Sequence, residues 1–312
     1  MLIGIDDKTP FIFAHEFFDA LPIHTFESVA PTPDSQPQKI MTPTGPTSIH
    51  QPLRQQHVST PQWRELMVAL NAKSVIENDK NEPEFQLTRA QASTPSSLVI
   101  PEISERYKAL KSQPGSIIEI SPESRIYVAD FARRIGGYTP KTNTRPMRRP
   151  GEVTSSAKPS SEEAIQVKKD KPSGAALILD YGTSSTIPIN SLRGVRQHAK
   201  VSPFACPGQV DVSADVDFTS LAEAAIGASD GVEVHGPVEQ ADFLQSMGIA
   251  ERADQLLKEV KDDEKRKSLE SGWKRLVDRG PNGMGRIYKA LAIIPENAGR
   301  RRPVGFGGGI GQ

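Results

Sequence analysis

The sequence predicts an α/β fold built around a parallel sheet, and three segments indicate it. Residues 11–14 form a short apolar run, and residues 174–182 form a longer one that ends in an acid and a glycine. Such runs are typical of strands that are buried on both faces of a parallel sheet. Between them, residues 121–137 have the pattern of a helix, so strands and helices alternate as in α/β proteins.

The helix within residues 121–137 has clear start and stop signals. Ser121 is a good N-cap, Pro122 suits the first helical position, and Glu123 places an acid in the first turn. Two glycines end the segment. With an expected strand at 116–120, the order of elements predicts a βαβ unit with a right-handed crossover that reaches residue 181.

The remaining elements extend this core. Residues 63–70 alternate weakly and, with 85–87 as a partner, predict a β-excursion from the main sheet. The C-terminal third predicts three helices and a closing strand, at 238–247, 251–260, 268–276 and 286–294.

Composition indicates long segments outside the core. Hydrophobic residues make up 36% of the 312 residues, aromatic residues 6%, and 26 residues are proline. A Pro/Thr/Gln-rich loop at 30–58, a Pro/Ser/Lys-rich insertion at 138–173 and a glycine-containing tail at 299–312 are therefore predicted to be disordered. This leaves 1–137 and 174–298 as the two parts of one folded core.

Charge and cysteine usage exclude several classes of protein. Lys+Arg and Asp+Glu both number 38, which does not suggest wholesale binding of nucleic acid. No run approaches the roughly 20 apolar residues of a membrane span. The lone Cys206 excludes an intramolecular disulfide and a cysteine-based zinc cage. The first residues resemble neither a signal peptide nor an Arg-rich transit peptide.

The first candidate site is formed by His15, Glu16 and Asp19, directly after the apolar run at 11–14. In open α/β sheets, ligands bind outside the carboxyl ends of the strands. A helical turn would place the two carboxylates on one side, where they suit a planar guanidinium that stays protonated.

Two other interpretations of this segment stay open. An acidic turn that caps itself, with Phe17 and Phe18 in the core, is the simpler one. A metallopeptidase-type zinc site is the other, since His-Glu-x-x-Asp differs from the zincin motif by one residue. The segment follows a strand, Pro22 ends it early and the second histidine is missing, so we expect no metal here.

Two further groups of polar residues lie at strand ends. Asp180 and Tyr181 end the run at 174–182, and we expect Glu16 and Asp180 to face a shared pocket. An N-cap role for Asp180 is the alternative. The loop at 207–218 carries three aspartates without the spacing of an EF-hand, so a loop paired with polar groups such as Arg193 is the alternative to calcium binding.

Several blocks of this sequence resemble the MidA-like methyltransferases, whose mitochondrial members assist the assembly of respiratory complex I. The most specific are HEFFDALP at 15–22 and PGQVDVSADVDF at 207–218. The others are QWREL, GAALILDYG, SLRGVRQHAK, ADFLQSMGI and GMGRIYKALAI, in the order of the family.

The resemblance implies a Rossmann-like methyltransferase fold with an added β-excursion and C-terminal helices. It implies S-adenosyl-L-methionine as the methyl donor and symmetric dimethylation of arginine in a protein substrate, a subunit of complex I, in the mitochondrial matrix. By resemblance, Glu16, Asp19 and His15 are the substrate-side candidates, and Asp180 and Tyr181 the cofactor-side candidates.

The chain departs from the family pattern in one respect. The family has an N-terminal portion with a glycine-rich turn between a strand and a helix, which lets the backbone approach the cofactor. Here the only glycine-rich run, 305–311, lies near the C-terminus, and we expect an incomplete chain. A non-catalytic assembly or interaction protein is therefore the alternative function.

Overall fold

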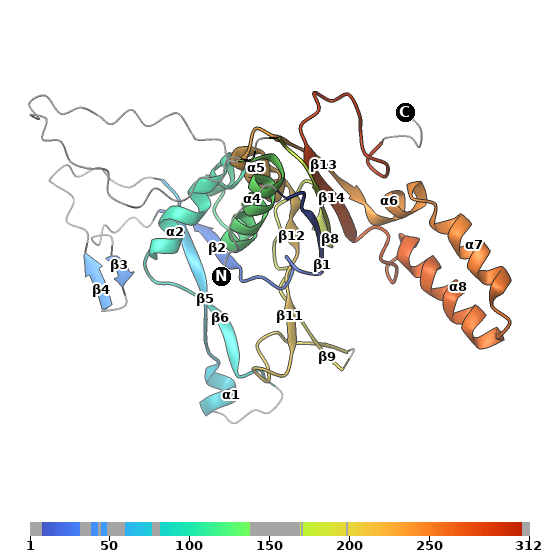
Figure 1. Ribbon diagram of the computed structural model, residues 1–312. Helices are drawn as coiled ribbons and strands as arrows, with labels where there is room; N and C mark the ends of the chain where they lie inside the picture. Colours follow the sequence, from blue (N-terminus) through green and yellow to red (C-terminus); the bar gives the residue numbers. More distant parts are fainter. Residues whose placement is uncertain are drawn as a thin grey trace, which may run out of the picture.

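The computed structural model describes residues 8–31, 39–42, 45–48, 60–76, 82–137, 169, 171–197 and 199–307 (Figure 1). The strands of the described part are β1 (Phe11–His15), β2 (His24–Val29), β3 (Lys39–Thr42), β4 (Gly45–Ser48), β5 (Gln62–Leu70), β6 (Phe85–Arg89), β7 (Ile117–Ile120), β8 (Ala175–Thr183), β9 (Arg193–Arg196), β10 (Ala199–Val201), β11 (Asp211–Ser213), β12 (Val216–Asp217), β13 (Val232–Glu239) and β14 (Tyr288–Pro295). The helices are α1 (Ala72–Ile76), α2 (Pro95–Val99), a 3₁₀ turn η1 (Ile100–Ile103), α3 (Glu105–Lys111), α4 (Pro122–Gly136), α5 (Phe218–Ala228), α6 (Gln240–Ser246), α7 (Ile249–Glu259) and α8 (Asp263–Val277).

The main sheet is mixed, with the strand order β1-β8-β14-β13 and with β12 paired to the end of β8. Strands β1 and β8 are parallel, with Phe13 opposite Leu177, whereas β14 is antiparallel to both of its neighbours. The prediction that the apolar runs at 11–14 and 174–182 are parallel strands of one sheet is confirmed.

Strand β8 is central because apolar side chains cover both of its faces. Ala176 and Ile178 belong to a core cluster with residues of α4 and α5. Leu177 and Leu179 face the other way, toward Phe243 of α6. A strand in this position has no solvated face, which explains why its sequence is a continuous apolar run rather than an alternating one.

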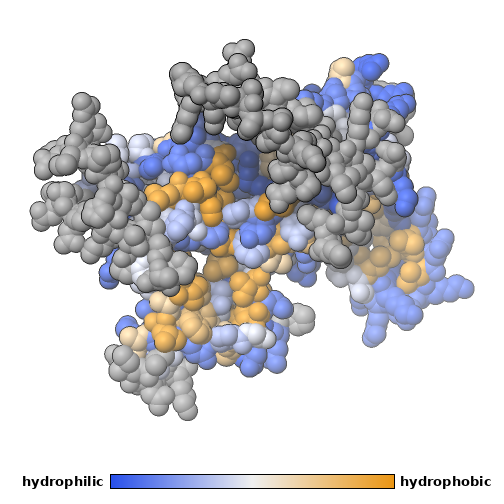
Figure 2. Space-filling model, turned by 60° about the vertical axis from the view of Figure 1, so that its left-hand side comes forward, coloured by the Kyte–Doolittle hydropathy of each residue, from blue (hydrophilic) through white to orange (hydrophobic). Residues whose placement is uncertain are grey.

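A second sheet, with the order β6-β5-β2-β7, is antiparallel throughout and forms the predicted β-excursion. Its own core contains Phe26, Trp63 and Tyr107. Figure 2 shows apolar surface in the lower part of the molecule, where Figure 1 places β5 and β6. There Val68 and Leu70 are more than half exposed.

The predicted βαβ unit that begins at residue 116 is wrong. Strand β7 lies in the second sheet, antiparallel to β2, and not beside β8. The parallel partner of β8 is β1, so the whole second sheet is inserted between β1 and α4. A four-residue apolar strand carries no local signal for its partner, and only the long-range pairing decides between the two sheets.

The C-terminal region follows the prediction closely. Helices α6, α7 and α8 and strand β14 lie at the predicted segments, although residues 238 and 239 belong to β13 rather than to a helix. Within the described ranges no helix combines the length and apolar character needed to cross a bilayer.

The three segments predicted as disordered are only partly described. Residues 39–42 and 45–48 pair as the hairpin β3-β4, and the rest of 32–59 lies outside the described residues. Most of 138–173 lies outside them as well. In the tail, Phe306 is 8% exposed and packs against Phe243, so the chain is anchored up to this point.

Strand β1 forms one edge of the described main sheet. Along it, Ile12 and Ala14 face the core cluster, and the alternate residues face outward. Phe11 is 82% exposed and Phe13 is 65% exposed. An edge strand with exposed aromatic residues is a surface on which further chain can pair.

Candidate functional site

The turn after β1 is held in place by the end of β8. The backbone N–H of Glu16 donates to the carbonyl of Leu179 at 3.1 Å. The Asp180 carboxylate then accepts from the N–H groups of Phe17 at 3.1 Å and Phe18 at 2.9 Å. Glu16 itself has a φ of 48°, a left-handed conformation that is strained for a residue other than glycine. Such strain persists where the surrounding structure fixes it and is frequent at functional sites.

A cavity of about 930 Å³ opens at the carboxyl ends of β1 and β8. Its walls come from the turn after β1, from the end of β8, from the small sheet β10-β9-β11, from the end of α8 and from the start of β14. Its charged and tyrosine lining residues are Glu16, Asp19, Tyr181, Arg193, Lys200, Asp211, Asp215, Arg275, Arg286 and Lys289.

One wall of the cavity is acidic. The Tyr288 hydroxyl donates to Glu16 Oε1 and thereby fixes this carboxylate. Asp19 is 8% exposed, and burial raises the pKa of its carboxyl above the ordinary value. The neighbouring Glu16 raises that pKa further, whereas Arg193 lowers it. Two carboxylates that interact in this way attract a cation, since a cation relieves their mutual repulsion.

Arg193 closes the acidic wall. Its Nη1 forms an ion pair with Asp215 Oδ1 at 2.5 Å, and its guanidinium lies 4.7 Å from the centre of the Tyr181 ring. Tyr181 in turn packs against Tyr288, with 4.0 Å between the ring centres. A guanidinium between an aromatic face and carboxylates is a stable arrangement in this protein. One guanidinium, that of Arg193, is thus already held at this wall of the cavity.

Asp180 lies beneath the cavity and does not line it. Its side chain is fully buried, and its Oδ1 also accepts from the Tyr181 N–H at 2.9 Å. Burial, followed by the charge of Asp19, raises the pKa of Asp180 to about 7, against the opposing effect of its backbone hydrogen bonds. The three donors explain what this acid does here: it connects the end of β8 to the turn after β1.

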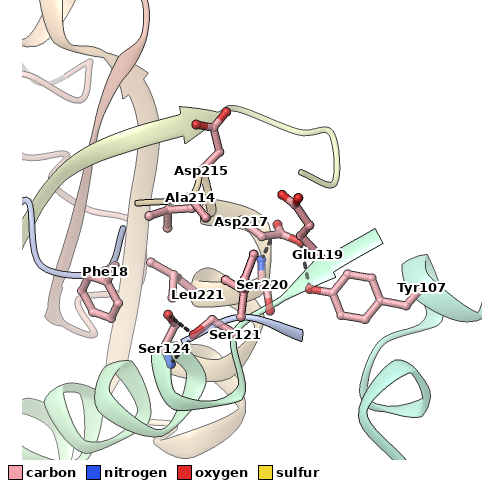
Figure 3. Close-up of a pocket in the computed structure, with 12 residues that line it drawn as sticks. Phe18, Tyr107, Glu119, Ser121, Ser124, Ala214, Asp215, Asp217, Ser220 and Leu221 are labelled. Atoms are coloured by element: carbon pink, nitrogen blue, oxygen red, sulfur yellow. Dashed lines mark hydrogen bonds between the residues drawn. The ribbon is translucent and has the colours of Figure 1, made fainter. Parts of the chain in front are cut away.

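A second, much smaller cavity of about 20 Å³ lies between the two sheets (Figure 3). Beside it, Asp217 accepts from Arg106 Nη1 at 2.9 and 3.1 Å and from the Tyr107 hydroxyl at 2.9 Å, and it caps α5. In Figure 3, Asp215 points away from this group. The space suits one water molecule, so we assign it a structural role.

These contacts resolve the three aspartates of the loop at 207–218. Asp215 pairs with Arg193, as the alternative to calcium binding predicts. Asp217 pairs with Arg106, a distant residue that the sequence did not indicate, and Asp211 is an exposed residue that lines the cavity. Within the described ranges, no three His, Cys, Asp or Glu side chains are grouped so as to hold a metal ion.

The structure brings some of the predicted site residues together and separates others. Glu16, Asp19 and Tyr181 line one cavity, and Asp180 supports it from below. His15 faces the outer side of β1, in line with Phe13, and is not a lining residue. The roles of these five residues stay predictions.

Sequence reasoning did not place Tyr288, Lys289 and Arg286 at the site. All three lie within the block GMGRIYKALAI, which was interpreted as a closing strand and as a block that resembles the family. Because β14 is antiparallel to β8, its first residues lie beside the carboxyl end of β8, and this follows only from the long-range pairing.

The residues present do not by themselves make a cradle for a nucleotide-type cofactor. In the described part of the chain, no strand is followed by a glycine-rich turn and a helix. The acid at the end of β8 is engaged by three backbone N–H groups and has no exposed surface. The described residues of this cavity therefore do not fit a nucleotide-type cofactor by themselves.

A mixed sheet with helices on its faces and a charged cavity at the carboxyl ends of its parallel strands defines a protein of the Rossmann-like α/β class. The family model described as "Putative S-adenosyl-L-methionine-dependent methyltransferase" matches residues 4–238. The chain belongs to this family.

Comparisons with individual proteins agree with this family membership. The chain is 27% identical over 299 residues to the mitochondrial protein arginine methyltransferase NDUFAF7 of Rattus norvegicus, covering 96% of this chain and 48% of that protein. It is 25% identical to NDUFAF7 of Homo sapiens over 285 residues, covering 91% and 45%.

A solved structure of a protein from Burkholderia thailandensis, bound to S-adenosyl-homocysteine, has the same fold. It superposes with a TM-score of 0.54 at 17% identity and covers 99% of this chain and 57% of that one. The chain thus spans about half the length of the relatives that it matches.

Proposed function

We propose that this chain forms the substrate-binding side of an S-adenosyl-L-methionine-dependent protein arginine N-methyltransferase. The observation that carries the proposal is the acidic wall of the 930 Å³ cavity, where Glu16 and Asp19 lie together at the carboxyl edge of β1. Family membership supports methyl transfer as the chemistry, and the relatives' names support arginine as the target.

In this proposal the substrate guanidinium enters between the carboxylates and the tyrosine pair. Tyr288 fixes Glu16 through its hydroxyl, and Asp180 fixes the turn that carries Glu16 and Asp19. Carboxylates bind the planar cation in a defined orientation, and orientation is the main contribution that a protein makes to in-line methyl transfer. The arrangement of Arg193, which stacks on Tyr181 and pairs with Asp215, supports this mode of binding.

The finer assignments follow the family resemblance. We infer that the product is symmetric dimethylarginine, that the substrate is a subunit of respiratory complex I and that the protein acts in the mitochondrial matrix. The names of the relatives, which include mitochondrial localisation, support the compartment.

The test is a binding assay with the 312-residue chain and arginine-containing peptides of mitochondrial proteins. The proposal predicts that a peptide with arginine binds and that the same peptide with lysine in place of the arginine binds much more weakly. A folded preparation that does not distinguish the two peptides overturns the proposal.

A non-catalytic assembly or interaction protein is the second candidate. The observation that favours it is that no glycine-rich strand-to-helix turn occurs within the described ranges. Calorimetry separates the two candidates. Binding of mitochondrial protein segments that is unaffected when lysine replaces their arginine supports the second candidate for this chain.

A further inference from the structure

The cavity also has four basic lining residues, here called the basic rim: Lys200, Arg275, Arg286 and Lys289. These residues come from β10, from the last turn of α8, from the segment before β14 and from β14 itself. Four cations from separate elements thus converge on one opening, although the chain as a whole carries equal numbers of acidic and basic residues.

Three of these cations have no carboxylate partner. Across the part of the chain that the structure describes, no ion pair involves Lys200, Arg275 or Arg286. Nearby on the same surface, Arg279 pairs with Glu239 at 2.8 Å and with Asp242 at 2.5 Å. Lys200, Arg275 and Arg286 differ from Arg279 in that they line the cavity and have no ion pair among the described residues.

Lys289 adds a buried charge to this rim. Its side chain is 5% exposed, and its ammonium donates to the carbonyl of Arg286. Burial and the charge of Arg286 both lower the pKa of Lys289, whereas Glu239 and Asp215 raise it. An anion at the rim would relieve the repulsion between these two basic residues.

We propose that the substrate is an acidic segment of protein, in which carboxylates flank the arginine that enters the cavity. This inference rests on the proposed function, because the arginine engages Glu16 and Asp19 while the flanking carboxylates engage Lys200, Arg275 and Arg286. A ligand that carries both an arginine and carboxylates is complementary to the acidic and the basic residues that line the cavity. Complementary charge increases specificity and the rate of association.

A nucleic acid fits this cavity less well. Its phosphates would satisfy the basic rim, but the same molecule would bring negative charge against Glu16, Asp19 and Asp211, which line the same cavity. Like charges placed together in a partly buried cavity oppose binding.

The test uses the full chain and three fluorescent peptides that share one central arginine. Their flanking residues are two aspartates on each side, two serines on each side, or two lysines on each side. Fluorescence anisotropy at low salt measures affinity, and we expect the acidic peptide to bind about five- to tenfold more tightly than the serine peptide. The lysine peptide should bind most weakly, and raising the salt concentration should remove the differences.

The variants Arg275→Glu and Arg286→Glu assign the effect to the rim. Each should abolish or reverse the preference for acidic flanks over serine flanks. The matched control is Lys267→Glu, which makes the same change of charge at an exposed position of α8 that does not line the cavity. Its preference should equal that of the unaltered chain.

The outcomes separate this inference from the proposed function. Equal affinity for all three peptides, with binding that still requires the central arginine, overturns the acidic-segment inference alone. Binding that is indifferent to replacement of arginine by lysine overturns the proposed function as well. An oligonucleotide that competes at the same concentration as the acidic peptide also overturns the inference.

Discussion

The Asp180 carboxylate accepts a 2.9 Å hydrogen bond from the backbone N–H of Phe18, across the boundary between β8 and the turn that follows β1. Through this contact, the last buried acid of the central strand fixes the segment that carries Glu16 and Asp19. The residues that follow β1 are thus positioned by Asp180 of β8, the neighbouring strand in the sheet.

The pH dependence of stability should reveal this buried acid. Burial and the charge of Asp19 raise the pKa of Asp180 to about 7 in the folded chain, against an ordinary value of 3.8. As the pH rises, the unfolded chain therefore loses this proton at a lower pH than the folded chain does. The contribution of Asp180 to the free energy of unfolding is therefore largest below pH 4 and falls between about pH 4 and 7.

The variant Asp180→Asn removes this titration while keeping an oxygen that accepts from the turn. Urea unfolding at a series of pH values should give a flatter profile between pH 4 and 7 for the variant. An unchanged profile would show that Asp180 does not titrate in this range.

The ion pair between the two sheets should be a major source of stability. In the variant Asp217→Ala, Arg106 loses its partner, the Tyr107 hydroxyl loses its acceptor and α5 loses its N-cap. We expect a loss of about 3 kcal/mol in the free energy of unfolding, because removing one partner leaves a part-buried charge unpaired. Urea denaturation measures it, and Asp217→Asn, which keeps the cap, should lose less. A loss below about 1 kcal/mol would contradict the assignment.

The hydroxyl of Tyr288 should matter for binding more than for stability. In Tyr288→Phe, Glu16 loses the donor that fixes it, and we expect the affinity for an arginine peptide to fall several-fold. Tyr107→Phe is the matched control, since it removes a hydroxyl from the small cavity between the sheets. The control should lose stability but keep peptide affinity, and equal effects of the two variants would contradict the role of Tyr288.

The outer face of β1 should drive self-association. Replacing Phe11 and Phe13 by threonine keeps strand propensity and removes two exposed aromatic rings. Sedimentation velocity should show less self-association for this variant at the same concentration. Ile226→Thr, at a 56% exposed position of α5, is the control and should behave as the unaltered chain. Association that is unchanged by the β1 variant would exclude this face as its cause.

The sequence was sufficient to predict the main elements of the central part of the fold. Strands β1 and β8, helix α4 and strand β14 follow from continuous apolar runs, caps and glycine stops, which are local signals. The second sheet was predicted as an excursion, but β7 was placed in the wrong sheet. Its apolar residues fit either core, and only pairing with β2 decides.

The candidate site was predicted only in part, because local signals locate some of its residues whereas the others depend on long-range contacts. Glu16 and Asp19 follow a recognisable strand end, so local sequence located them. Asp180 was also located, but whether it faces the cavity or the backbone of Phe17 and Phe18 depends on the orientation of one side chain. Tyr288 lies in β14 and Arg286 just before it, more than 100 residues along the chain from β8, and no local pattern connects the two segments.

The most direct test of the account compares two peptides that differ in one atom group. Titration calorimetry at pH 7.5 should show that a peptide with arginine binds about tenfold or more tightly than the same peptide with citrulline, its neutral isostere. The double variant Glu16→Gln, Asp19→Asn should lose this difference while remaining folded. Equal affinities for the two peptides in the unaltered chain, or a preference for arginine that survives in the double variant, would contradict the assignment of the acidic wall.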